Sequence, residues 1–214
     1  GELVGTVNNA DVKEQDLINM MVGRELTNVY PKREVPIGDV VLKVENLSSG
    51  TLVQGISFEV RKGEILGIGG LVGSRRTEML EALFGLRPIT EGKIYLNGKE
   101  LYPRNPRHVI QNGIAFVTED RKKSGLVLCL PVYENMSMIN VQRPSFAGYL
   151  NWKKLKENAQ VHRKTLNIRV SRIEQVINSL SGGNQQKVAL AKWLDFSPKV
   201  IIFDEPTRGI DIGA

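Results

Sequence analysis

The chain has 214 residues, of which 41% are hydrophobic and 24% are charged, and this composition indicates a globular protein and excludes a disordered or fibrous one. The formal net charge of +6 is compatible with nucleic acid, acidic lipid or phosphate ligands, but the basic residues are scattered and show no aromatic-and-basic recognition pattern. The single cysteine excludes an internal disulfide and favours a reducing compartment, and no apolar run is long enough to cross a bilayer.

The N-terminal segment is predicted to be separate from the rest of the chain. Residues 1–7 are expected to form a lone strand. A helix is expected to begin at Asp11, because an acidic residue follows three positions later as in a capping box, and Gly23 would end it. Residues 24–39 contain two prolines and six charges without hydrophobic periodicity, so they are predicted to be a linker. The main domain is expected to begin near Val40.

Strands and helices alternate through the main domain, which predicts an α/β fold with a largely parallel sheet. The apolar run of residues 62–70 is predicted to be a buried strand that leads into a glycine-rich loop. Asn97-Gly98 is typical of a type I′ turn, so the surrounding residues are predicted to form a hairpin. The other predicted strands cover residues 40–47, 51–60, 114–117 and 199–203.

The predicted helices fall between these strands. One follows the glycine-rich loop and ends at Gly85, and another covers residues 104–112. Helix-rich sequence then runs from about residue 131 to residue 196, with breaks at Pro144 and near Ser171, and this length suggests a second lobe.

The glycine-rich loop reads GGLVGSRRTEML and lies where a phosphate-binding loop would lie, between a strand and a helix. The pattern G-x-x-x-x-G-K-[ST] requires glycine and then lysine before the hydroxyl residue, but this chain has two arginines there. The candidate phosphate-binding residues are Gly70, Gly73, Ser74, Arg75, Arg76, Thr77 and Glu78.

The last apolar strand delivers two carboxylates to its C-terminal end, which is where open α/β sheets bind ligands. Asp204 could hold a magnesium ion through water, and Glu205 could polarise an attacking water. The alternative interpretation is a strand that ends in an acidic turn without any catalytic role.

A third motif, SLSGGNQQK, places Ser181, Gly182 and Gly183 immediately before an amphipathic helix. Free N–H groups at a helix start attract anions, and two glycines allow a phosphate to approach the backbone closely. The alternative interpretation is an ordinary serine-capped helix.

The three motifs occur in a fixed order, with about a hundred residues between the loop and LSGGNQQK and about twenty more before the acidic strand end. This order resembles the nucleotide-binding domains of ATP-binding cassette (ABC) transporters over nearly all of residues 40–214. GGLVGSRRT matches the family's Walker A loop, VIIFDEP its Walker B strand and RGID its D-loop.

The resemblance implies a P-loop NTPase core with a parallel sheet, an antiparallel β subdomain and a helical subdomain over about residues 120–182. It implies ATP and Mg²⁺ as cofactors, with Thr77 and Asp204 near the metal, Glu205 as the catalytic residue and Asp211 in the D-loop. The signature residues, which would contact a nucleotide held by another cassette, are Leu180, Ser181, Gly182, Gly183, Asn184 and Gln185.

Three variants, NQQK, TRGID and VTEDR, resemble the second cassette of the tandem ATPases that serve importers of ribose, galactose and xylose. Residues 1–23 would then end the preceding cassette, residues 24–39 would link the two, and residues 40–214 would form a second cassette without its C-terminal part. Its sheet would be incomplete, with an apolar edge that lowers stability or promotes association. The implied partners are the first cassette, membrane-spanning permease subunits and, indirectly, a periplasmic or extracellular sugar-binding protein, and the implied location is the cytoplasmic face of the membrane.

The sequence also departs from the family pattern. The region around Ser49 has no aromatic residue to stack on adenine, and Glu119 stands where the family's Q-loop has a glutamine. Arg76 keeps the positive charge of the missing lysine but is bulkier, and Arg75 adds a side chain where close backbone approach is needed. We therefore expect weakened nucleotide binding and slow hydrolysis at this site, with an intact signature that serves the first cassette.

Two other functions fit parts of this pattern. Some ABC-type ATPases act on nucleic acid or ribosomes, but the scattered basic residues and the NQQK and TRGID variants disfavour this alternative, and no nucleic-acid partner is expected. A purely regulatory cassette, which binds nucleotide without hydrolysing it, differs only in that Glu205 would be idle.

Overall fold

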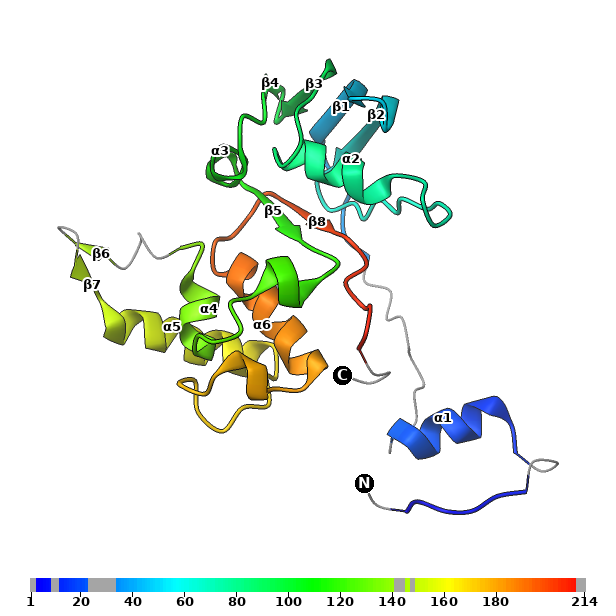
Figure 1. Cartoon of the computed structure of the whole chain (residues 1–214), viewed down its shortest axis with the longest axis vertical. Helices are drawn as coiled ribbons and strands as arrows, with labels where there is room; N and C mark the ends of the chain where they lie inside the picture. The colour runs from blue at the N-terminus through cyan, green and yellow to red at the C-terminus, as the bar shows by residue number, and fades with distance from the viewer. Residues whose placement is uncertain (1–2, 9–11, 23–33, 141–144, 147–148, 211–214) are drawn as a thin grey trace.

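The computed structural model describes residues 3–8, 12–22, 34–140, 145–146 and 149–210. An antiparallel sheet, a parallel sheet, a short two-stranded hairpin and a group of helices make up the fold (Figure 1). The elements are α1 (Glu14–Val22), β1 (Val40–Ser49), β2 (Val53–Arg61), α2 (Arg76–Leu83), β3 (Glu91–Leu96), β4 (Lys99–Glu100), α3 (Pro106–Asn112), β5 (Ile114–Val117), η1 (Arg121–Gly125), α4 (Val132–Ser137), β6 (Ser145–Phe146), β7 (Tyr149–Leu150), α5 (Trp152–Thr165), η2 (Ile177–Ser179), α6 (Gly182–Leu194) and β8 (Val200–Phe203).

The larger sheet is antiparallel, with the strand order β2-β1-β3-β4. The predicted hairpin is confirmed, because β3 pairs with β4 across Asn97 and Gly98, whose φ angles of 50° and 74° fit a type I′ turn. This sheet covers the side of α2 that carries Met79, Leu80 and Leu83, and these side chains are buried together with apolar residues of β1 and β3. The antiparallel β subdomain is therefore present.

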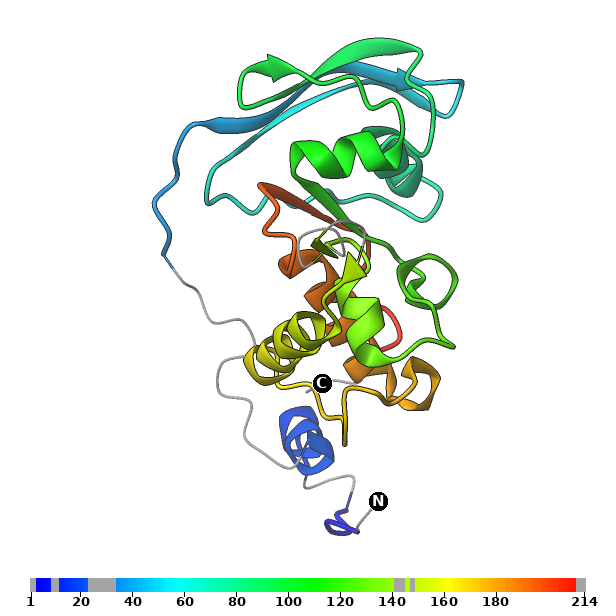
Figure 2. The same cartoon turned by 90° about the vertical axis from the view of Figure 1, so that its left-hand side faces the viewer.

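The parallel sheet consists of β5 and β8, which run in register from Ile114 opposite Val200 to Val117 opposite Phe203. It lies between the antiparallel sheet and the helices α4, α5 and α6 in both views (Figures 1 and 2). Since the carboxyl ends of parallel strands meet at one edge, the residues after Val117 and after Phe203 come close together.

The prediction of a buried strand over residues 62–70 is wrong. The segment pairs with no strand in the described part of the chain, and Ile65 is 98% exposed. It lies along an apolar groove of about 420 Å³, which is bordered on its other side by Val200–Phe203 of β8. An apolar run predicts burial but does not specify a pairing partner, and its glycines lower the propensity for a strand. The parallel sheet is consequently smaller than predicted.

A second hydrophobic core lies among the helices that follow β5. It is built from α4, α5, α6 and the loops between them, with Val132, Met136, Ile177 and Val188 at most 1% exposed. The predicted break near Ser171 is confirmed, since the residues between α5 and η2 form a loop, whereas the predicted break at Pro144 lies outside the described residues. The short hairpin of β6 and β7 was not predicted.

The N-terminal predictions are confirmed in part. Residues 3–8 form no regular structure, so the predicted strand over residues 1–7 is wrong; a strand needs a partner, and none pairs with this segment in the described parts of the chain. The helix begins at Glu14, and the predicted start at Asp11 and stop at Gly23 lie outside the described residues. Within the described ranges, no helix is long and apolar enough to cross a bilayer.

Buried Asn135 joins α4 to the loop that precedes it. Its Oδ1 accepts a hydrogen bond from the Val127 amide at 2.8 Å, and its Nδ2 donates to the carbonyl oxygens of Val127 and Pro131 at 3.0 and 3.1 Å. The side chain is fully buried, and its hydrogen bonds hold the loop of Val127 against the start of the helix.

We therefore expect Asn135→Ala to lower the free energy of unfolding by about 2 kcal/mol, because it leaves the Val127 amide without its partner and removes a fully buried side chain. Chemical denaturation would measure the change. The matched control is Asn178→Ala, at an exposed position, which we expect to cost less than about 0.5 kcal/mol. Equal losses in the two variants would contradict the assigned role of Asn135.

Candidate functional site

The glycine-rich loop turns back on itself before α2 begins. The amide of Ser74 donates to the carbonyl of Leu71 at 3.0 Å, and Gly73 has a φ of 85°. A Cβ atom on Gly70 would lie 2.5 Å from Ser74 Oγ, so this close approach requires glycine. Arg75, at the N-cap of α2, has a φ of 65°, a left-handed conformation that L side chains adopt at a cost.

A cavity of about 590 Å³ lies between this loop and the carboxyl ends of β5 and β8. The structure brings eight of the seventeen predicted site residues together around it, and it adds three charged residues that were not predicted. The predicted residues are Gly73, Ser74, Arg75, Arg76, Thr77, Glu78, Glu119 and Glu205, and the added ones are Glu81, Arg87 and Arg208.

Arg76 contacts the carboxylate that was predicted to be catalytic. Its Nη2 lies 3.1 Å from Glu205 Oε1, and the two side chains are 30% and 44% exposed. Glu205 has a φ of 42°, a strained conformation of the kind found at functional sites. The arginine that replaces the phosphate-loop lysine is therefore neutralised within the chain by Glu205.

Thr77, which lines the cavity, lies beside Asp204, which lines the neighbouring apolar groove. The Thr77 hydroxyl is hydrogen-bonded to the Asp204 carboxyl group, and burial raises the pKa of Asp204 above its usual range. Asp204 Oδ2 is buried without a hydrogen-bond partner among the described residues. A carboxylate oxygen in this condition, next to a threonine hydroxyl, fits a hydrated Mg²⁺ ion, whose charge would favour the ionised carboxylate.

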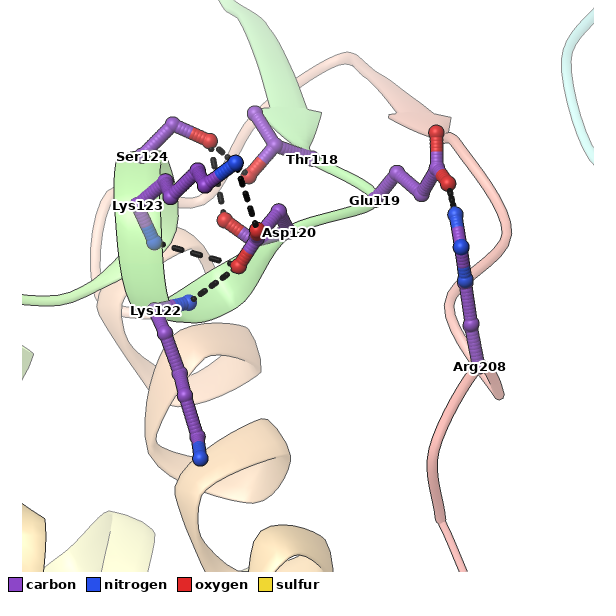
Figure 3. Close-up of polar contacts among 7 residues, drawn as sticks. All are labelled: Thr118, Glu119, Asp120, Lys122, Lys123, Ser124 and Arg208. Carbon is purple, nitrogen blue, oxygen red and sulfur yellow. Dashed lines mark hydrogen bonds and ion pairs between the residues drawn. The ribbon is translucent and has the colours of Figure 1, made fainter.

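Glu119 follows β5 and points toward Arg208, from the loop after β8, with which it forms an ion pair (Figure 3). The neighbouring Asp120 has a different role. Its Oδ1 accepts hydrogen bonds from the Lys122 and Lys123 amides at 3.0 and 3.1 Å and so caps the η1 helix. Two adjacent acidic residues thus face different partners.

Arg208 is one of the three charged cavity residues that were not predicted from sequence. It belongs to the TRGID sequence, which was used to recognise the D-loop and the family variant but not to assign a site residue at position 208. Its backbone is held on both sides, because its amide donates to the Glu205 carbonyl at 3.1 Å and its carbonyl accepts from Arg121 Nη1 at 3.1 Å. The sequence did contain one indication of such a residue, because the acidic residue at position 119 needs a basic partner.

The signature residues lie away from this cavity, at the start of α6. A Cβ atom on Gly182 would lie 2.7 Å from Arg121 Nη2 and 3.2 Å from the Gly209 carbonyl oxygen, so the helix start is packed against the loop after β8. Asn184 donates to Ser181 Oγ at 2.9 Å and accepts from the Arg169 amide at 2.7 Å.

The other predicted motif residues differ in position. Gln185 is 3% exposed and donates to the carbonyls of Ile177 and Leu180, which fixes the turn before the helix. Leu180 is likewise buried, whereas Ser181 is exposed and Gly183 is partly buried. Asp211 lies outside the described residues.

The family model for ABC transporters matches residues 53–208 of this chain. The chain belongs to the ABC transporter family. A ribose import ATP-binding protein from Geobacillus kaustophilus is 43% identical to the cassette, and a protein from Halalkalibacterium halodurans, named as a candidate ribose/galactose/methyl galactoside import ATP-binding protein, is 45% identical. Each match covers 100% of this chain and 43% or 41% of the relative, so the chain spans about two fifths of their length.

Solved structures of ATP-binding cassettes have the same fold as this chain. A dimeric ATP-binding cassette in a post-hydrolysis state, bound to ADP and Pi, superimposes with a TM-score of 0.66, over 80% of this chain and 78% of that one, at 24% identity. This similarity confirms the predicted α/β, P-loop NTPase fold class.

Helix α6 is joined to the residues after Glu119 by a buried lysine. Lys192 is 6% exposed, and its Nζ donates at 2.6 Å to the carbonyl of Gly125, the last residue of η1. The ammonium group also lies 5.1 Å from the centroid of the Trp193 ring. Burial lowers the pKa of Lys192 to about 8.

This pKa predicts a stability that rises with pH. Above about pH 8 folded Lys192 releases its proton, whereas in the unfolded chain it stays protonated up to the ordinary value of 10.5, so the unfolded state binds more protons between these limits. We expect the free energy of unfolding to rise from about pH 8 to pH 10.5 relative to Lys192→Met, measured by urea denaturation. Lys187→Met on the same helix is the control and should retain the rise. Parallel curves for wild type and Lys192→Met would contradict this assignment.

Proposed function

We propose that this chain is the second nucleotide-binding cassette of a tandem ATPase that energises monosaccharide import. The names of the relatives support sugar import, and the coverage of about two fifths of their length supports a chain that is one part of a longer protein. The VTEDR and TRGID variants support the second position, with residues 1–23 as the end of the preceding cassette and residues 24–39 as the linker.

The proposed ligand of the cavity is ATP with Mg²⁺. The loop amides before α2 would contact the phosphates, and Thr77 and Asp204 would hold the metal ion, which neutralises phosphate charge when bound. Glu205 would polarise the attacking water. The observation that supports the proposal most directly is the Arg76–Glu205 ion pair. A bound nucleotide would have to separate Arg76 from Glu205, the carboxylate that is needed for hydrolysis. We infer weak binding and slow hydrolysis at this site.

The signature would act on the nucleotide of the first cassette. Ser181 is exposed at the start of α6, and Gly182 leaves no side chain between the helix and the adjoining loop. The free N–H groups of this helix start suit a phosphate held by a facing cassette. The chain's larger contribution to activity would then be made at its partner's site.

The proposed partners are the first cassette of the same polypeptide and the membrane-spanning permease subunits, with a periplasmic or extracellular sugar-binding protein acting through them. Import of this kind would place the cassette on the cytoplasmic face of the membrane as a peripheral subunit.

Disabling ATP hydrolysis by the first cassette tests the proposed difference in activity between the two nucleotide sites. In the full polypeptide, with the Walker A loop of the first cassette disabled, we expect ATP turnover to fall at least about tenfold, since the remaining site lacks the phosphate-loop lysine. Steady-state phosphate release would measure the rate, and weak MgATP binding by the silenced protein should persist. Turnover at the wild-type rate would contradict the proposal.

A bulky residue in the signature tests its action in trans. We expect Gly182→Val to lower the ATPase activity of the full polypeptide at least about tenfold, because the side chain displaces Arg121 and blocks the approach of a phosphate. Gly67→Val is the control, because a Cβ atom there meets nothing within 4 Å. An unchanged rate for Gly182→Val would exclude a role of this helix start in hydrolysis.

A further inference from the structure

The charged residues around the cavity form complete pairs. Four arginines and four glutamates line it, and each arginine is paired with one glutamate. Besides the two pairs described above, Arg75 contacts Glu78 at 2.8 Å and Arg87 contacts Glu81. The cavity is therefore close to electrically neutral, although it holds four cationic side chains.

The pairs differ in what they connect. Arg75 and Glu78 are three positions apart at the start of α2, and Arg87 and Glu81 are six apart at its end, so these two pairs follow from local sequence. The Glu119–Arg208 pair instead joins the residues after β5 to the loop after β8. It depends on the tertiary fold and on the backbone of Arg208.

Glu119 is a partly buried carboxylate whose charge is balanced by a residue distant in the sequence. Its side chain is 30% exposed and lines the cavity, and Arg208 is its only ion-pair partner in the described part of the chain. An unpaired carboxylate at this position would repel a polyphosphate, since like charges a few ångströms apart in a partly buried site interact strongly. Arg208 is aimed at it by the turn that starts at Glu205 and by the Arg121 guanidinium.

We propose that Arg208 is a positioning residue for nucleotide binding: it neutralises Glu119 and so makes a carboxylate at the Q-loop position compatible with bound polyphosphate. The inference rests on the proposed function of the cavity as a nucleotide site. Arg208 acts through Glu119 and does not itself contact the phosphates. The consequence is that the effect of losing Arg208 depends on which residue stands at position 119.

A double-mutant cycle tests this dependence. The parent is the full polypeptide with the Walker A loop of its first cassette disabled, and the probe is a fluorescent ATP analogue with Mg²⁺. We expect Arg208→Gln to weaken binding about tenfold, because it leaves Glu119 unpaired, and Arg208→Lys to restore it. We expect Arg208→Gln to have less than about a twofold effect when Glu119→Gln is already present.

Lys123→Gln is the matched control for the loss of one positive charge. Lys123 lies in the adjacent η1 helix, is 87% exposed and does not line the cavity, so we expect its replacement to leave binding unchanged. The restored binding in the double variant would also show that Arg208→Gln does not act by unfolding the site.

Two results would overturn the inference while the proposed function stands. One is unchanged binding in Arg208→Gln, and the other is an equal loss with and without Glu119→Gln, which would mean that Arg208 contacts the nucleotide directly. Failure of the parent polypeptide to bind the probe at millimolar concentration would instead overturn the proposed function, and the inference with it.

Discussion

The burial of helix α6 in two hydrophobic cores is the packing constraint on which the site geometry depends. Trp193 packs edge-on against Phe84, the residue that follows α2, with ring centroids 5.9 Å apart, in the core between the sheets. Val188 and Ala191 of the same helix belong to the core of the helical region. Among the described helices, α6 alone contributes buried side chains to both cores. The start of α6 therefore cannot shift relative to the phosphate loop unless one core is repacked, because interiors are close-packed.

The two parts of the candidate site, the start of α6 and the glycine-rich loop, are held by different interactions. The signature end relies on backbone packing and amide side chains, since Gly182 lies against the adjoining loop and Gln185 bonds the turn before the helix. The phosphate loop relies on charge, since each arginine at the cavity is satisfied by a glutamate. Partly exposed ion pairs stabilise a fold little. Their arrangement accordingly bears more on which ligand can enter than on the stability of the cassette.

Most of the fold was predicted from local sequence signals. Asn97-Gly98 specified its turn by backbone preference, and the apolar strand before Asp204 and Glu205 was short, uninterrupted and bounded by polar residues. The prediction of a strand over residues 62–70 was wrong because its apolar pattern indicates only burial, whereas a strand also needs a neighbouring strand to pair with. Arg208 could not be assigned from sequence, because its contact with Glu119 spans 89 positions and depends on the pairing of β5 with β8. Tertiary ion pairs leave no periodic signal in a single sequence.

The in-register pairing of β5 and β8 also determines which charges travel together in any rearrangement. Val117 lies opposite Phe203, and Glu119 and Glu205 each follow two residues after this pair, while Arg76 lies in a separate element, α2. A rigid-body displacement of α2 against the parallel strands would lengthen the Arg76–Glu205 contact and leave the Glu119–Arg208 contact unchanged. The Arg76–Glu205 distance is therefore sensitive to the position of α2 relative to the parallel strands, whereas the Glu119–Arg208 distance is not, because both of its residues follow those strands.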